Sequence, residues 1–264
     1  MTVQRIRRTS TIGRRGLEVL SAIPDEAGPE TPPLLFVHGL GHAAWCWEQW
    51  MDAAAEAGHP AYAVSLSGHG ASAGALRRAT IGDYVDDVLH TAASLPRRPV
   101  LVGHSMGGLV VQRVLARYSA YAGVLVAPVP AHPAVGSLLA IARRHPTDAA
   151  RMLLGGSLPL RPEYLFAALD TTEARRVAER CGPESPLAQY QLLLHWPAAP
   201  PRDAPVLVLA APDDALVPIA DVRRTARRYD ADVHEFPGMG HDLMLDRGWR
   251  QPLRAMTDWL AAAG

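Results

Sequence analysis

The chain has 264 residues, of which 48% are hydrophobic and 20% charged, so it can form one large domain with a single core and an insertion. Its 26 basic and 26 acidic residues balance, so net charge provides no attraction to nucleic acid or to an anionic membrane. Every basic residue is an arginine, and the absence of lysine excludes mechanisms that need a Schiff base or a lysine general base.

The cysteine content and the N-terminal residues indicate the cellular compartment. Cys46 and Cys181 are too few for a disulfide framework, so we expect two free thiols in a reducing compartment. The arginine-rich residues 1–15 are not followed by an apolar stretch of signal-peptide length, and no segment approaches the roughly 20 apolar residues that span a bilayer. We therefore expect a cytoplasmic protein without a membrane or nucleic-acid partner.

Short apolar runs alternate with helical patterns in the first half of the chain, which is typical of strands joined by helical crossovers in a mostly parallel sheet. The run 34–37 is apolar throughout, as expected for a strand covered on both faces, whereas apolar residues of the segment 80–95 recur at helical spacing. The predicted strands are residues 16–23, 34–37, 62–66, 99–101 and 123–127, and the predicted helices are residues 43–57, 80–95 and 109–115.

This alternation stops between residues 129 and 201, where proline and glycine separate short helical patterns and no strand is predicted. We predict that residues 129–201, called the inserted segment below, form a helical lid between two strands of a core made of residues 1–128 and 202–264. Its start signals include Ser185 as a helix N-cap before a proline. The helical patterns are residues 138–144, 162–169, 172–180 and 186–195, after which we predict strands at 205–209 and 233–236 and a final helix at 248–263.

One serine lies on a sharp turn between a predicted strand and a predicted helix. Ser105 is flanked by Gly103 and Gly107, which leave room for a strained backbone that points the hydroxyl out of the sheet. A serine hydroxyl is a poor nucleophile near neutral pH, so it needs a base within hydrogen-bond reach and a third group that orients the base. Because similar strings occur at ordinary turns, the rest of the chain must supply these partners.

Candidates for both partners follow later strands. Asp213 and Asp214 come shortly after the strand 205–209, at the carboxyl end where ligands gather in open parallel sheets. His241 follows the strand 233–236 and has glycines nearby. The chain order is therefore serine, acid, histidine.

This order, with the serine turn, resembles the α/β-hydrolase superfamily over roughly residues 17–260. The resemblance implies an α/β-hydrolase fold, with a mostly parallel central sheet flanked by helices. It implies Ser105 as nucleophile and His241 as base. The family usually places its acid four residues before a proline at the next helix, which favours Asp214 and leaves Asp213 as the alternative.

The resemblance also implies an oxyanion hole. The loop after the strand 34–37 matches the family loop that provides one backbone N–H, here that of Leu40, and the residue after the nucleophile, Met106, provides the other. His38 is expected to brace this loop and His104 to pack beside the serine turn, without chemical roles.

Neither a metal site nor a cofactor is predicted. The remaining histidines lack metal-ligand spacing with carboxylates or thiols. The Gly107-Gly108 pair could suggest a phosphate cradle, but the Gly-x-Gly-x-x-Gly string of a dinucleotide site is missing.

The aromatic segment 41–50 is similar to the loop-to-helix stretch of plant methylesterases and hydroxynitrile lyases. The lyases depend on a threonine and a lysine at positions where this chain has Gly39 and Asp242, so the resemblance favours hydrolysis. We interpret Asp242 as a loop or helix-cap group. Candidates for substrate contact are Trp47, His42 and Trp196. For Trp47, helix packing is the alternative to substrate contact and the one that we favour.

The expected function is that of a serine hydrolase, a carboxylesterase or lactonase, acting on a medium-sized and largely apolar small molecule as a monomer or homodimer. Ser105 in place of an aspartate excludes the alkyl-enzyme chemistry of related epoxide hydrolases and dehalogenases. Two alternatives stay open. The same triad could serve C–C cleavage, thioester release, elimination or cyclisation, or the scaffold could be a receptor or binding module.

Overall fold

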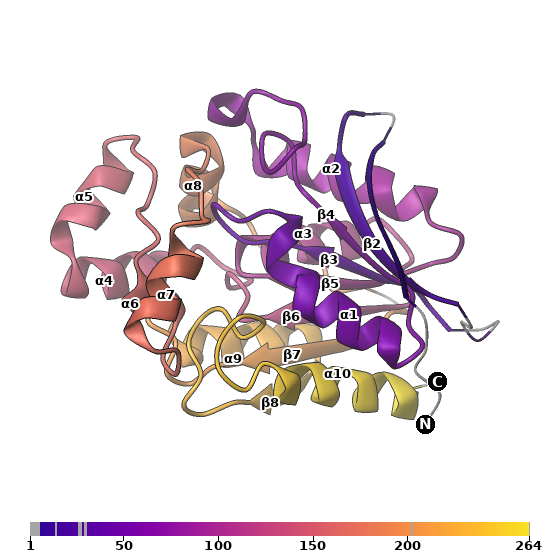
Figure 1. Ribbon diagram of the computed structural model, residues 1–264. Helices are drawn as coiled ribbons and strands as arrows, with labels where there is room; N and C mark the ends of the chain where they lie inside the picture. Colours follow the sequence, from indigo (N-terminus) through magenta and orange to yellow (C-terminus); the bar gives the residue numbers. More distant parts are fainter. Residues whose placement is uncertain (1–5, 14, 26–27, 29–30, 202, 264) are drawn as a thin grey trace.

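The computed structural model describes residues 6–13, 15–25, 28, 31–201 and 203–263. The strands in these ranges are β1 (Ile6–Ile12), β2 (Glu18–Pro24), β3 (Leu34–Val37), β4 (Ala61–Val64), β5 (Val100–His104), β6 (Ala122–Val126), β7 (Val206–Ala210) and β8 (Asp232–Glu235). They form one sheet in the order β1-β2-β4-β3-β5-β6-β7-β8 (Figure 1). β2 is antiparallel to β1 and β4, and the other neighbouring pairs are parallel.

The central strands are buried on both faces of the sheet. Every residue of β3, β5, β6 and β7 is buried, in agreement with the apolar runs that predicted these strands. Because parallel strands end at the same edge, the loops after β3, β5, β7 and β8 converge there. Leu40, Ser105, Asp214 and His241 lie on these loops.

Helices pack on both faces of the sheet. In Figure 1, α1 (Glu48–Glu56) and α10 (Arg250–Ala263) lie in front of the sheet, and α2 (Ile81–Ser94) lies behind it. α2 packs against α3 (Met106–Leu115), and α9 (Ile219–Tyr229) packs against β7. Two short 3₁₀ turns are η1 (Ala44–Trp47) and η2 (Leu76–Arg78). α2 begins with a capping box, in which Thr80 and Asp83 each accept the other's backbone N–H.

The inserted segment forms short helices between β6 and β7, at the left of Figure 1. They are α4 (Val135–Arg144), α5 (Pro146–Leu153), α6 (Pro162–Leu165), α7 (Thr171–Ala178) and α8 (Pro186–Leu194). The Ser185 hydroxyl accepts the Ala188 N–H at the start of α8, as an N-cap should. These helices have little sheet to pack on, so they bury their apolar faces against one another and against the loops at the sheet edge.

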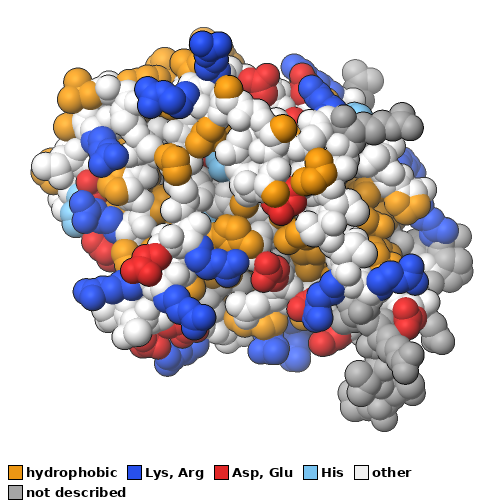
Figure 2. All heavy atoms as spheres, turned by 45° about the horizontal axis from the view of Figure 1, so that its top comes forward, with side chains coloured by type: hydrophobic (Ala, Val, Ile, Leu, Met, Phe, Trp, Pro, Cys, Tyr) orange, Lys and Arg blue, Asp and Glu red, His pale blue; other side chains and the backbone are white. Residues whose placement is uncertain are grey.

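The outer surface of the inserted segment exposes large apolar side chains. Leu154 and Trp196 are each 87% exposed, and Leu194 is 76% exposed. Figure 2 shows hydrophobic side chains between blue arginines toward the left, where α4, α5 and α8 lie. No helix among the described residues combines the length and apolar character that crossing a membrane requires.

One strand and one α-helix were not predicted. β1 alternates arginine, serine and threonine, carries no apolar run, and pairs only with β2 at the edge of the sheet. α5 is short and starts at Pro146, directly after α4. Both elements are fixed by packing onto neighbours rather than by a strong local pattern.

Candidate active site

The turn between β5 and α3 holds Ser105 in a strained conformation. Ser105 has φ 52° and ψ −116°, outside the regions that residues with a side chain ordinarily adopt. A Cβ at Gly103 would collide with the Gly107 carbonyl, and a Cβ at Gly107 would collide with the carbonyls of Val37 and His38. Both glycines are required because backbone approaches backbone at this turn.

Backbone hydrogen bonds keep the strained turn in place. The Ser105 N–H donates to the Val126 carbonyl over 3.0 Å. The Ser105 carbonyl accepts the N–H groups of Gly108 and Val129, each over 2.9 Å. The hydroxyl-bearing residue is therefore fixed from both sides before any ligand arrives.

A cavity of about 50 Å³ lies against Ser105. Leu40 lines it from the core, and Leu216 and Val217 line it from the loop after β7. The inserted segment supplies the rest, mostly apolar: Val129, Ala134, Ser137, Leu138, Ile141, Met152, Leu158, Gln189, Leu192 and Leu193. This volume suits one or a few water molecules.

The two predicted oxyanion donors are unpaired. Neither the Leu40 N–H nor the Met106 N–H has a hydrogen-bond partner among the described residues. Met106 begins α3, where the first N–H groups have no partner within the helix. His38 braces the loop, since its Nδ1–H donates to the Gly39 carbonyl over 2.9 Å and its Nε2 accepts the Leu66 N–H over 3.0 Å. Burial lowers the pKa of His38 well below 6.5, which keeps this acceptor available.

A carboxylate orients His241. The Nδ1–H of His241 donates to Asp214 Oδ2 over 2.6 Å, while Asp214 Oδ1 accepts the N–H groups of Leu216 and Val217 over 2.7 and 3.0 Å. Burial would lower the pKa of His241, but the Asp214 carboxylate outweighs burial and raises it above 6.5. Bonded in this way, the ring leaves Nε2 free to accept a proton.

The structure separates the two candidate acids. Asp213 Oδ2 accepts the Gly238 N–H over 2.7 Å, so Asp213 braces the loop that precedes the histidine. It is Asp214, and not Asp213, that contacts His241. The side-chain hydrogen bond of His241 in the described residues goes to Asp214, and none joins it to Ser105 Oγ. Such bonds are often long in enzymes without substrate and tighten in the complex.

A buried ion pair lies beside the loops that carry Leu40 and His241. His42 donates from Nε2 to Asp242 Oδ2 over 3.1 Å and from Nδ1 to the Leu40 carbonyl over 2.8 Å. Burial would lower the pKa of His42, but Asp242 raises it well above 6.5, so His42 is a cation. His104 is its neutral neighbour, because burial lowers its pKa to about 3. Asp242 lies on the loop after β8 and is the fully buried counter-ion of His42, a partner that the sequence did not indicate.

The three predicted substrate contacts lie away from the cavity at Ser105. Trp47 is fully buried and stacks on Phe36 with ring centroids 4.9 Å apart, which is the packing role considered as its alternative. Trp196 projects into solvent, and both ring nitrogens of His42 are bonded within the protein. Apart from Leu40 and Ser105, the residues that line the cavity belong to no motif, and most of them are simply apolar.

A second buried carboxylate, Asp246, joins the inserted segment to the histidine loop. Its side chain accepts the N–H groups of Gly240, Ala167 and Ala168 over 2.7, 3.0 and 3.1 Å. A Cβ at Gly240 would lie 2.6 Å from the Leu165 carbonyl oxygen, so the two segments touch backbone to backbone. Sequence reasoning missed Asp246, because its partners lie about 80 residues earlier.

One group of side chains has the spacing of metal ligands. Ligand atoms of His104, His241 and Asp242 all lie within 4.8 Å of one another. Hydrogen bonds account for this closeness: His104 Nε2–H donates to the His241 carbonyl over 3.2 Å, and Asp242 is paired with His42. We therefore interpret these three side chains as a hydrogen-bonded cluster.

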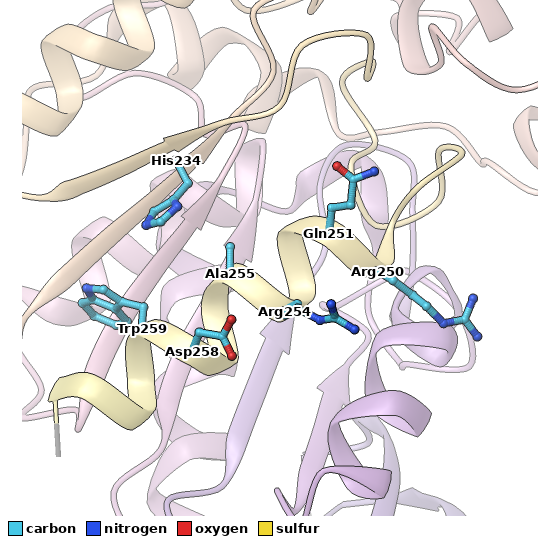
Figure 3. Close-up of a pocket in the computed structure, with 7 residues that line it drawn as sticks. All are labelled: His234, Arg250, Gln251, Arg254, Ala255, Asp258 and Trp259. Atoms are coloured by element: carbon cyan, nitrogen blue, oxygen red, sulfur yellow. The ribbon is translucent and has the colours of Figure 1, made fainter.

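A larger hollow, of about 600 Å³, lies on the outside of the molecule along α10. Figure 3 shows its lining from β8 and α10: His234, Arg250, Gln251, Arg254, Ala255, Asp258 and Trp259. It contains none of the strained, buried or unpaired groups found at Ser105. The small cavity at Ser105 is thus the better candidate for chemistry.

The chain is similar to known proteins in sequence and in fold. The chain matches the model of the alpha/beta hydrolase family over residues 34–255. The probable esterase PIR7A of Oryza sativa subsp. indica is 38% identical over 110 residues, which are 40% of this chain and 42% of the relative. Methylesterase 10 of Arabidopsis thaliana is 32% identical over 111 residues, 40% of each protein. The match thus spans about two fifths of the length of these curated relatives.

The fold is similar to that of a solved structure, a soluble variant of monoglyceride lipase from Saccharomyces cerevisiae. The TM-score is 0.75 at 14% sequence identity, and the match covers 100% of this chain and 98% of the other. At this identity the similarity concerns the fold, and it confirms the predicted fold class. Because the family model spans the serine turn, the acid and the histidine, the chain belongs to the alpha/beta hydrolase family.

Proposed function

We propose that this protein is a serine hydrolase that cleaves a carboxylic ester or lactone of a medium-sized, largely apolar small molecule. The strongest support is the 2.6 Å bond from His241 Nδ1–H to Asp214, on loops that converge at the strained Ser105. A histidine oriented by a carboxylate beside a serine is the arrangement that activates a hydroxyl nucleophile. The esterase names of two relatives support an ester as the substrate.

The chemistry would run in two halves. Ser105 Oγ attacks the acyl carbon while His241 Nε2 takes its proton, and the Leu40 and Met106 N–H groups bind the oxyanion that forms. Collapse of this intermediate expels the alcohol, which receives the proton from His241, and leaves an acyl-enzyme on Ser105. Water then repeats the sequence and releases the acid. Asp214 stays ionised and stabilises the imidazolium form of His241 in both halves.

The walls of the cavity favour an apolar acyl group. Ile141, Met152 and Leu192 come from three different helices of the inserted segment and all face the cavity. A charged substrate would have to lose its hydration there without a compensating partner. The limited volume also implies that the inserted segment yields when substrate enters, which is the role of a lid.

A fluorophosphonate probe tests the nucleophile. We expect it to label Ser105, as located by peptide mass spectrometry, and we expect the labelling rate to collapse in His241→Ala. Ser105→Ala is the negative control and should lose both labelling and turnover of p-nitrophenyl esters. A folded His241→Ala variant that labels at the wild-type rate would contradict the assignment.

A panel of acyl chain lengths and lactones then addresses the substrate. Turnover of simple esters supports hydrolysis. Labelling of Ser105 without turnover of any ester or lactone would point to a non-hydrolytic use of the triad. Tight binding of a ligand without labelling would point to a binding module.

A further inference from the structure

For the hydrolase proposed above, we infer that Glu184 is a positioning residue for the oxyanion hole. Its buried carboxylate holds the loop that carries the Leu40 N–H and thereby couples the inserted segment to the catalytic centre. This role depends on the proposed function, since only an acyl-transfer enzyme requires the Leu40 N–H to be held in place.

The contact between the two segments is made at Gly41. The Gly41 N–H donates to Glu184 Oε2 over 3.3 Å, and the Gly41 carbonyl accepts the Gly182 N–H over 2.7 Å. Gly41 has φ +63°, and a Cβ there would lie 2.5 Å from the Gly182 carbonyl oxygen. Both backbone hydrogen-bonding groups of the residue after Leu40 are therefore bound by the inserted segment.

The other backbone groups beside the Leu40 N–H are held from within the core. The Leu40 carbonyl accepts His42 Nδ1–H over 2.8 Å, and the Gly39 carbonyl accepts His38 Nδ1–H over 2.9 Å. The Leu40 N–H itself has no partner among the described residues. Hydrogen bonds therefore hold the loop on both sides of the Leu40 N–H. Glu184 is the side chain of the inserted segment that makes one of these bonds.

The carboxylate of Glu184 is saturated with donors. Oε1 accepts the Tyr84 hydroxyl over 2.6 Å and the Ser185 N–H over 2.7 Å, and Oε2 also accepts His69 Nε2–H over 3.1 Å. Burial would raise the pKa of Glu184, but these hydrogen bonds outweigh burial and lower it, so the group is ionised. Bonds to an ionised acceptor are stronger than neutral ones, which suits a carboxylate that must fix a loop.

The chain offers a matched control for a purely structural role. Tyr84→Phe removes one donor from Oε1 and leaves the contact of Oε2 with Gly41 intact. Glu184→Gln replaces one oxygen by an amide nitrogen, which cannot accept, so the amide cannot serve both pairs of donors. Both variants lose buried hydrogen bonds, but only Glu184→Gln disturbs the support of the oxyanion loop.

The experiment compares both variants with wild type in melting temperature, in kcat and KM for a p-nitrophenyl ester, and in inhibition by an alkylboronic acid. The boronic acid forms a tetrahedral adduct with a catalytic serine. We expect Glu184→Gln to lower kcat roughly 10- to 100-fold, less than the loss of a whole oxyanion donor, with little change in KM. Boronate affinity should fall by a similar factor. Tyr84→Phe should lower the melting temperature while kcat stays within about twofold.

Equal losses of kcat in the two variants, in proportion to their losses of melting temperature, would overturn the positioning role. If Glu184→Gln does not fold, Glu184→Asp provides the same test, because it keeps the charge but withdraws the carboxylate from Gly41 by one methylene. Failure of the proposed function would look different. In that case wild-type Ser105 would not be labelled by the fluorophosphonate, or Ser105→Ala would retain activity, whatever the behaviour of Glu184.

Discussion

The Asp214 carboxylate divides its oxygens between the backbone and the histidine. Oδ1 accepts two backbone N–H groups of its own loop, and Oδ2 accepts the His241 Nδ1–H. An asparagine can keep the backbone bonds through its oxygen, but it then presents an N–H₂ group to His241 Nδ1. The ring would be held in the tautomer that cannot take a proton from Ser105.

We therefore expect Asp214→Asn to lower kcat by about 10⁴-fold with the fold intact. Asp214 raises the pKa of His241 above 6.5, and His241 must be neutral to act as a base. In wild type, kcat/KM should rise with pH through an inflection above 6.5, and in Asp214→Asn the remaining activity should have its inflection at lower pH. Asp213→Asn is the control and should keep the wild-type inflection. An unchanged pH profile in Asp214→Asn would contradict this assignment.

Some of the predicted site residues can be recognised from their neighbours in the sequence, and others cannot. Ser105 and His241 are recognisable because each has neighbouring glycines directly after a strand. Asp213 and Asp214 cannot be separated locally, because the conformation of their loop decides which carboxylate turns toward His241. The pairing of Asp242 was not predicted because its partner, His42, lies 200 residues away in the sequence.

At the scale of elements, the inserted segment is attached to the core by buried carboxylates. Asp246 is fully buried and bonds the Ala167 and Ala168 N–H groups on one side and the Gly240 N–H on the other. Its removal would leave these donors without acceptors in a site closed to water. It would also free the backbone next to His241.

We expect Asp246→Ala to lower the free energy of unfolding by about 3 kcal/mol, since each orphaned buried donor costs about 1–3 kcal/mol. The exposed N-cap Asp170 is a matched control, because its side chain also accepts backbone N–H groups, those of Thr172 and Glu173. Asp170→Ala should cost about 1 kcal/mol. Urea unfolding measures both values, and kcat should fall only in Asp246→Ala. An equal loss of free energy of unfolding in the two variants would show that the buried hydrogen bonds of Asp246 stabilise the fold no more than an exposed helix cap does.

The elements that sequence patterns predict well are those that bury a strong apolar signal. β3 was predicted with its observed bounds because all four residues are apolar and covered. β1 has no such signal, since its strand conformation comes from pairing with β2 along its whole length. The attachment of the inserted segment is still less predictable, because it depends on individual polar contacts such as those of Glu184 and Asp246.

Across the whole molecule, the buried histidines fall into two groups with opposite effects on stability. For His42 and His241 the pKa is raised, so their contribution is complete below pH 6.5 and is lost only as pH rises through the folded-state pKa. For His38, His104, His195 and the partly buried His59 burial lowers the pKa, in His104 to about 3. The unfolded chain binds protons at these positions below pH 6.5 more readily than the folded chain does, so acid favours unfolding.

Between pH 6.5 and about pH 5, the free energy of unfolding should change mainly through the histidines whose pKa is lowered by burial. Carboxylates with a lowered pKa lose their stabilising effect only at still lower pH. We expect the free energy of unfolding to fall by about 1.4 kcal/mol per pH unit for each of His38 and His104. Urea unfolding across this range measures the slope. His104→Gln, which can still donate to the His241 carbonyl, should reduce the slope by about 1.4 kcal/mol per pH unit. A wild-type stability that is constant or rises on acidification would mean that these rings take up protons within the folded core.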